Sequence, residues 1–167
     1  PEVHASRLVE NRVFAESVKA HVAAGMPVYA ECGGLMYLAR ELRVNDVAHP
    51  MSGVLDLVIE QTGRPQGHGY EKVIVDRPNP FFPVGTELQG HEFHYSKVVS
   101  GSSLSETVAS VSRGTGTGEG RDGIVAGNVW ASYLHIHASA TPDWAAGFLA
   151  AAMTHAVDHT QPAAAWG

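Results

Sequence analysis

The sequence predicts an α/β domain with a central, mostly parallel sheet. Three observations support this prediction: an amphipathic helix pattern near the start, helix and strand patterns that alternate at both ends, and a β-rich middle. Alternation of this kind is typical of α/β folds, because a crossover helix returns the chain to a parallel strand. With 167 residues, 44% of them hydrophobic, the chain is long enough for one such domain and short for two.

The first part of the chain predicts a helix, a strand and a second helix. From residue 6 to residue 24 apolar side chains recur every three or four positions, and a glycine and a proline then end the pattern. The run "PVYAE" predicts a short buried strand. The two glycines that follow Cys32 open another apolar-periodic stretch, which we expect to be helical as far as Leu42.

The rest of the chain predicts strands followed by a final helix. "SGVLDLVIEQ" and "YEKVIVDR" are strand-like, whereas "SRGTGTGEGRDG" indicates a mobile loop or a hairpin tip. The glycines of that run are a weak phosphate-loop signal, because no Lys-Ser/Thr pair ends it. "GIVAGNVWASYLHIHA" predicts two more strands and "TPDWAAGFLAAAMTHAV" a helix, and residues 161–167 are expected to form a frayed tail.

Charge and composition exclude several classes of function. The formal net charge of -6, with both signs evenly mixed, leaves no basic stripe for nucleic acid. The apolar runs are far shorter than the roughly 18 to 20 residues that cross a bilayer, so no membrane partner is expected. One cysteine cannot form an internal disulfide, and the start does not resemble a signal peptide, so we expect a cytoplasmic protein.

Cys32 stands where a strand is predicted to end and a helix to begin, which is the geometry of a nucleophile elbow. The first turn of such a helix favours a thiolate and is expected to lower the pKa of the thiol. The N–H of Gly33 would donate to an oxyanion. Free cysteine is also among the most buried residue types, so the local pattern alone fits a core residue as well.

A thiolate nucleophile needs a base, and the chain has ten histidines. His135 follows a β-like run and is expected at the carboxyl end of a strand, where the ligand crevice of an open α/β sheet forms. It is therefore the best base by position. His137 would point to the same side of a strand, so spacing alone does not separate the two.

Three motifs, "YAECGGLMYL", "GHEFHYS" and "ASYLHIH", together resemble the class I, or triad-type, glutamine amidotransferases, in the branch of the cobyrinate and cobyric acid synthases. The motifs stand in the family's order, and the similarity covers essentially the whole chain. The resemblance implies a flavodoxin-like three-layer fold. It also implies that Cys32 attacks the carboxamide of glutamine, that His135 is the base, and that Gly33 contributes to the oxyanion hole.

The chain departs from the family at two places. In the family a glycine-rich turn with a second oxyanion donor precedes the position of Pro1, so we expect residues 1–160 to be a partial, weakly active domain whose N-terminal part is missing. Triad enzymes carry a Glu two residues after the catalytic His, where this chain has His137. The expectation is a Cys-His dyad, with Glu31 and Glu92 as candidate substitutes for the third member.

The resemblance implies further partners. Glutamine would donate ammonia to a corrinoid tetrapyrrole, cobyrinate or hydrogenobyrinate, whose a and c carboxylates become amides during cobalamin biosynthesis. A sirohydrochlorin-type acceptor is an alternative. An upstream synthetase domain would supply ATP and Mg²⁺, so this portion is expected to bind no cofactor itself. A homodimer is a further candidate.

Polar residues around the motifs have two interpretations. Glu31 and Gly34 adjoin the elbow and are candidates for contact with substrate or with the partner domain. Alternation along "GHEFHYS" places Glu92 and His94 on one face, either near the glutamine pocket or an interface, or in a half-buried strand with a structural role.

Three other functions compete with amidotransfer. Paired histidines suggest a metal-binding module, and the pairs are His91/His94, His135/His137 and His155/His159. No HExxH or paired-cysteine motif accompanies them, so we expect no metal. The second competing function is a cysteine peptidase built on the same elbow. The third is a non-catalytic remnant that is kept for binding.

Overall fold

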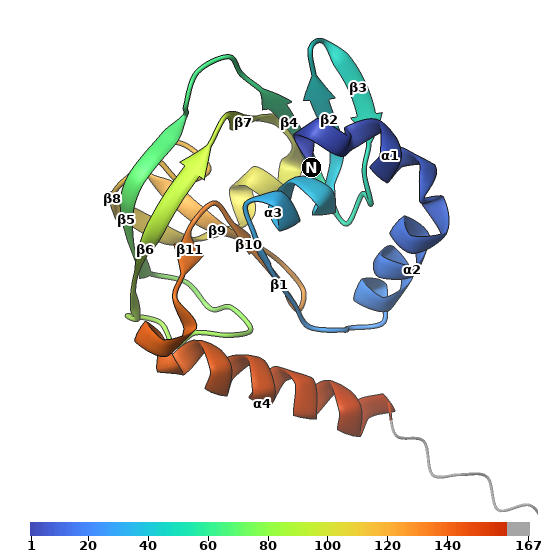
Figure 1. Cartoon of the computed structure of the whole chain (residues 1–167). Coiled ribbons are helices and arrows are strands. Elements are labelled where there is room, and N and C mark those ends of the chain that lie inside the picture. Colours follow the sequence, from blue (N-terminus) through green and yellow to red (C-terminus); the bar gives the residue numbers. More distant parts are fainter. Residues whose placement is uncertain (160–167) are drawn as a thin grey trace, which may run out of the picture.

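A computed structural model describes residues 1–159 as two β-sheets flanked by helices (Figure 1). The tail expected at residues 161–167 lies outside the described residues. The α-helices are α1 (Ala5–Glu10), α2 (Arg12–Ala23), α3 (Gly33–Leu38) and α4 (Pro142–His159). The strands are β1 (Val28–Glu31), β2 (Ala39–Val44), β3 (Val47–Pro50), β4 (Leu55–Gln61), β5 (Gly67–Val75), β6 (Glu87–His94), β7 (Ser96–Ser100), β8 (Thr107–Arg113), β9 (Arg121–Ala126), β10 (Val129–Ser132) and β11 (His135–Ile136). Short 3-10 turns occupy Glu2–His4, Ser102–Glu106 and Ala138–Ala140.

The sheets confirm the α/β class but are mixed rather than mostly parallel. The larger sheet has seven strands in the order β1-β10-β9-β8-β5-β6-β11, and the smaller has four in the order β3-β2-β4-β7. Among the strands of residues 1–159, parallel pairing occurs only between β1 and β10 and between β2 and β4. Several neighbouring strands, such as β2 and β3 or β9 and β10, are joined by links too short for a crossover, and short links impose antiparallel pairing.

Both faces of the larger sheet are covered near β10. Val129 and Ala131 enter one hydrophobic cluster, which includes Leu35 and Met36 of α3. Trp130, between them, enters a second cluster against which the side chains of α4 pack. Because alternate residues of a strand point to opposite faces, the sheet is the middle of three layers here, as predicted. In Figure 1, α4 lies on one side of this sheet and α3 on the other.

The predicted helices differ from the observed ones in two places. The helix expected from residue 6 to residue 24 is broken at Asn11, whose side chain accepts a hydrogen bond from Phe14 N (3.3 Å) and caps α2. The helix expected to reach Leu42 is wrong beyond Leu38, because Ala39–Val44 forms β2. Pairing of β2 with both β3 and β4 buries Leu42 completely, so tertiary contacts override the local apolar period.

The glycine-rich run forms the tip of the hairpin between β8 and β9, one of the two predicted alternatives. It is packed against the sheet, since Gly116 and Thr117 are buried. None of the helices within residues 1–159 combines the length and apolar character needed to cross a membrane.

Candidate active site

Cys32 occupies the predicted elbow between β1 and α3. Its backbone has φ 44° and ψ -95°, a conformation that a non-glycine residue adopts only under strain. The Cys32 N–H donates to Ser132 O (2.8 Å) on β10, and its carbonyl accepts from Met36 N (3.0 Å) on α3. The strained turn is therefore held from both sides, and it leaves the thiol half-buried.

Small residues surround the elbow. A Cβ added at Gly33 would lie 3.0 Å from Pro1 Cδ, and one added at Gly34 would lie 3.1 Å from Ala30 Cβ. The first residue of the chain thus packs directly against the turn, beside α3 (Figure 1). The Pro1 amino group pairs with the Glu2 carboxylate at 3.1 Å.

The environment of Cys32 raises the pKa of its thiol. Burial is the largest cause, the charge of Glu2 adds to it, and the N–H of Gly33 opposes both. We expected the first turn of the helix to lower this pKa, but the net shift is upward, because burial raises the pKa more than the Gly33 N–H lowers it. A thiol of this kind depends on a base to become a nucleophile.

His135 begins β11 and lies against β6. It pairs with His91, whose ring stacks on it with centroids 4.8 Å apart and planes 8° from parallel. Its Nδ1 lies 3.2 Å from the His91 carbonyl oxygen. A carbonyl can only accept, so we infer that the proton sits on Nδ1 and that Nε2 carries the lone pair of a base.

A hydrogen bond joins the residue before Cys32 to the residue after His135. Ile136 N, directly after His135, donates to Glu31 Oε1 at 3.0 Å, and Glu31 directly precedes Cys32. The parallel pairing of Glu31 with Ser132 joins the same two segments. β1 and β11 are at opposite ends of the strand order, yet this bond brings the elbow and the histidine segment next to each other, and Glu31 engages the backbone of β11.

Glu92 and His94 lie in the interior, as the half-buried strand interpretation expects. Glu92 is 2% exposed, and its two carboxylate oxygens accept from Thr115 N (2.7 Å) and Gly116 N (3.1 Å) in the glycine-rich hairpin tip. His94 Nδ1 donates to Ser96 O at 2.7 Å, and the His94 ring stacks on Tyr133 with centroids 3.7 Å apart. These contacts serve the packing of the sheet and the hairpin tip.

His137 is exposed and lies close to His135 in the chain. Its Nδ1 is 2.8 Å from Ser139 Oγ. A shallow hollow beside the candidate base is lined by Tyr70, Gln89, Gly90, His91, His135, Ile136 and His137. Cys32 does not line this hollow, so it lies on the His135 side alone.

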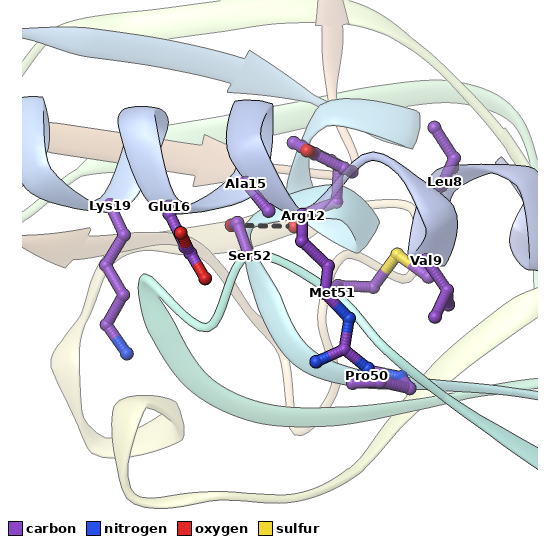
Figure 2. A pocket seen from close by; sticks show the side chains of 10 residues that line it. Leu8, Val9, Arg12, Ala15, Glu16, Lys19, Pro50, Met51 and Ser52 are labelled. Carbon is purple, nitrogen blue, oxygen red and sulfur yellow. Dashed lines mark hydrogen bonds between the residues drawn. The ribbon is translucent and has the colours of Figure 1, made fainter.

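A separate pocket lies between α1, α2 and the segment that follows β3 (Figure 2). Neither Cys32 nor His135 lines it. Ser52 Oγ donates to Tyr37 O at 2.9 Å in its wall. The lining residues are Leu8, Val9, Arg12, Ala15, Glu16, Lys19, Tyr37, Pro50, Met51 and Ser52.

The paired histidines are not joined by a larger cluster of metal-ligating side chains among those that the structure describes. Within residues 1–158 no three His, Cys, Asp or Glu side chains gather as a ligand set. His91 and His94 point to opposite faces of β6, because His91 is exposed and His94 is 3% exposed.

Two buried acids, Glu71 and Asp122, were missed by sequence reasoning. Glu71 shares a strand face with Val73 and Val75 and is fully buried. An acid in register with apolar residues of an alternating strand is a signal that could have identified it. Asp122 sits within the glycine-rich run, where nothing in the sequence marks burial.

Comparisons with known proteins show what the chain is similar to. The model of the CobB/CobQ-like glutamine amidotransferase domain matches residues 1–143. A cobyrinate a,c-diamide synthase of Magnetococcus marinus is 41% identical over 148 residues, which cover 87% of this chain and 31% of that protein. The enzyme of the same name from Methanothermobacter thermautotrophicus is 39% identical over 148 residues, with coverage of 89% and 32%.

The fold also matches a solved structure. A crystal structure described as a glutamine amidotransferase superimposes with a TM-score of 0.59 at 23% identity, covering 83% of this chain and 68% of the other. At this identity the likeness shows the fold alone. The chain spans about a third of the length of the curated relatives it matches.

Proposed function

This chain belongs to the family of CobB/CobQ-like glutamine amidotransferase domains, and we propose that it releases ammonia from glutamine with Cys32 as nucleophile and His135 as base. The observation that supports the proposal most directly is the bond from Ile136 N to Glu31 Oε1, which joins the residues adjacent to both candidates. Nucleophilic catalysis by a Cys-His pair requires the thiol and the imidazole to lie close together, and a bond between their neighbouring residues supports that arrangement.

The proposed chemistry follows from the two side chains. His135 Nε2 takes the proton of the Cys32 thiol, and the sulfur attacks the carboxamide carbon of glutamine. The C–N bond then breaks, and His135 returns the proton to the leaving ammonia. Water hydrolyses the glutamyl thioester, which yields glutamate and restores the thiol. The Gly33 N–H would donate to the oxyanion of each tetrahedral intermediate.

The raised pKa of Cys32 makes the base essential in this scheme. Burial disfavours the thiolate before substrate binds, so few molecules carry it at neutral pH. A neutral His135 with its lone pair on Nε2 can take the proton as the attack proceeds. Activity should therefore depend on both residues rather than on a preformed thiolate.

We propose that the ammonia serves a longer protein of the kind named cobyrinate a,c-diamide synthase. In that protein the a and c carboxylates of cobyrinate or hydrogenobyrinate would be amidated with ATP and Mg²⁺ bound outside this portion, in the cytoplasm. The relatives' shared name and their identity of 39 to 41% with this chain support this acceptor over a sirohydrochlorin-type one.

Ammonia release and covalent labelling test the proposal. A glutamine-analogue diazoketone should label the full chain at Cys32, and Cys32→Ala should abolish both labelling and ammonia release from glutamine. His135→Asn should lower the rate roughly 100-fold or more, the usual contribution of a general base. His21→Asn, an exposed histidine on α2, is the matched control and should leave the rate unchanged. Ammonia release that persists in Cys32→Ala overturns the proposal.

A further inference from the structure

A buried carboxylate holds the backbone that leads into His135. Asp122 on β9 is 1% exposed, and its Oδ2 accepts from Tyr133 N (3.2 Å) and Leu134 N (3.1 Å). Residues 133 and 134 link β10 to β11 and belong to neither strand, so their N–H groups are outside the strand ladders. A buried N–H needs an acceptor, and a charged one binds more strongly than a neutral one.

A second carboxyl group lies against the first. Glu71 on β5 is fully buried, and if it were ionised neither of its oxygens would meet a hydrogen-bond donor. Glu71 and Asp122 interact electrostatically, and two buried carboxyl groups at close range avoid adjacent negative charges when one of them carries a proton. Because Asp122 already accepts from backbone N–H groups and Glu71 does not, we place that proton on Glu71.

The charges around the pair favour this placement. Burial, followed by the negative charges of Asp122 and Glu92, raises the pKa of Glu71. Burial also raises the pKa of Asp122, but the N–H groups of Gly123, Leu134 and Tyr133 lower it. One neutral carboxyl that donates to one carboxylate is the arrangement that avoids two adjacent buried charges.

The glycine-rich hairpin tip covers the pair. A Cβ added at Gly114 would lie 2.8 Å from Glu92 Oε1 and 2.9 Å from Glu71 Cγ. One added at Gly116 would lie 3.0 Å from Asp122 Cβ. Glycines therefore let the backbone pack directly on the three acids and exclude water, which gives the run a packing role in place of a phosphate-binding one.

We propose that Asp122 is a positioning residue for His135, and that the Glu71 carboxyl is the donor that holds the Asp122 carboxylate in place. The inference rests on the proposed function, because it concerns the orientation of the proposed base. By fixing the two residues before His135, Asp122 sets where β11 starts. It thereby also fixes Ile136 N, which bonds to Glu31 beside the elbow.

Two substitutions with opposite expected outcomes test the proposal. Asp122→Asn keeps one acceptor oxygen but turns an NH₂ group toward the backbone donors, and it should lower kcat for glutamine hydrolysis roughly 10- to 100-fold with little change in KM. Glu71→Gln keeps a donor toward Asp122 and should stay within about twofold of the unmodified chain. Glu119→Gln, an exposed acid on the same hairpin tip, is the control.

A double-mutant cycle separates positioning from general stability. If Asp122 acts through His135, Asp122→Asn should cost little further rate in a His135→Asn background. Both variants should also shift the pH dependence of Cys32 alkylation by iodoacetamide in the same way. An equal loss of rate in the two backgrounds, or an unchanged pH profile in Asp122→Asn, overturns the proposal.

Two further measurements keep the test decisive. Should Asp122→Asn not fold, Glu71→Ala removes the donor and should lower kcat where Glu71→Gln does not; equal rates in these two variants refute the inference. Hydrogen exchange at the amides of Tyr133 and Leu134 should accelerate in Asp122→Asn even if the chain does not hydrolyse glutamine. Failure of the proposed function, seen as rates independent of Cys32, is thereby distinguished from failure of the positioning role.

Discussion

Replacement of Glu71 by Gln should change how the stability of the protein depends on pH. In the folded chain burial and neighbouring charges raise the pKa of Glu71 above its ordinary value, so folding takes up a proton at neutral pH. For an acid whose folded pKa is raised, the free energy of unfolding is highest below the ordinary pKa. It falls as the pH rises toward the folded pKa. The Gln variant has no proton to take up and should lose this dependence.

The size of the effect follows from the linkage of one proton. Each pH unit should reduce the free energy of unfolding by about 1.4 kcal/mol while Glu71 stays protonated in the folded chain and ionised in the unfolded one. Between about pH 5.5 and 8 the loss is roughly 3 kcal/mol, a large part of the 5 to 15 kcal/mol that typically stabilises a domain. Glu71→Gln should therefore be the more stable protein at pH 8.

Urea unfolding followed by tryptophan fluorescence measures this difference, because Trp130 is buried in the core. The assay compares the unmodified chain, Glu71→Gln and the surface control Glu119→Gln at several pH values. The control should follow the unmodified chain. Parallel pH dependences for Glu71→Gln and the unmodified chain, or a Gln variant that is less stable at pH 8, would refute the placement of the proton.

Three further predictions concern the elbow and its partner segment. Gly90→Ala places a Cβ in direct clash with His135 O, so it should separate β11 from β6, destabilise the fold by about 1 to 3 kcal/mol and lower glutaminase activity. Glu31→Ala removes the acceptor of Ile136 N, and we expect about 1 to 3 kcal/mol of lost stability in urea unfolding together with slower ammonia release. Alkylation of Cys32 by iodoacetamide should keep accelerating with pH beyond the range of an ordinary thiol, because burial raises its pKa.

Matched variants decide whether these outcomes have the stated causes. Gly63→Ala adds a methyl group where nothing lies within 4 Å and should be close to neutral in stability and activity. Glu31→Gln retains an acceptor oxygen and should restore most of what Glu31→Ala loses. Equal losses in both members of either pair would contradict the mechanism. An alkylation rate that levels off near neutral pH would contradict the raised pKa of Cys32.

The elbow could be predicted because it depends on local sequence. The pattern is a short strand that is followed by Cys32 and two glycines, and its geometry follows from neighbours in the chain. The prediction that His135 ends a strand differs from the structure, which places it three residues after β10, at the start of the short strand β11. Alternation along β6 also predicted that Glu92 and His94 share one face, and the structure shows that this face is buried, which was one of the two interpretations.

Features that depend on distant pairing could not be predicted in the same way. The change from helix to strand after Leu38 is enforced by β3 and β4, which lie beyond it in the chain. The pKa of Cys32 is raised by burial and by Glu2, which is thirty residues away in the sequence. A prediction that considered only the helix after Cys32 therefore expected a shift in the wrong direction. The contact of Glu71 with Asp122 joins β5 to β9, two strands that are not neighbours in the sheet.

The orientation of the His135 ring depends on the backbone on either side of it. In a triad a carboxylate fixes the imidazole and also stabilises the imidazolium that forms. Here the Nδ1 partner is the carbonyl of His91, which fixes the tautomer but brings no negative charge. A base oriented by backbone alone is only as well placed as that backbone. The Asp122 bonds before His135 and the Glu31 bond after it therefore supply, by position, part of what a third triad member supplies by charge.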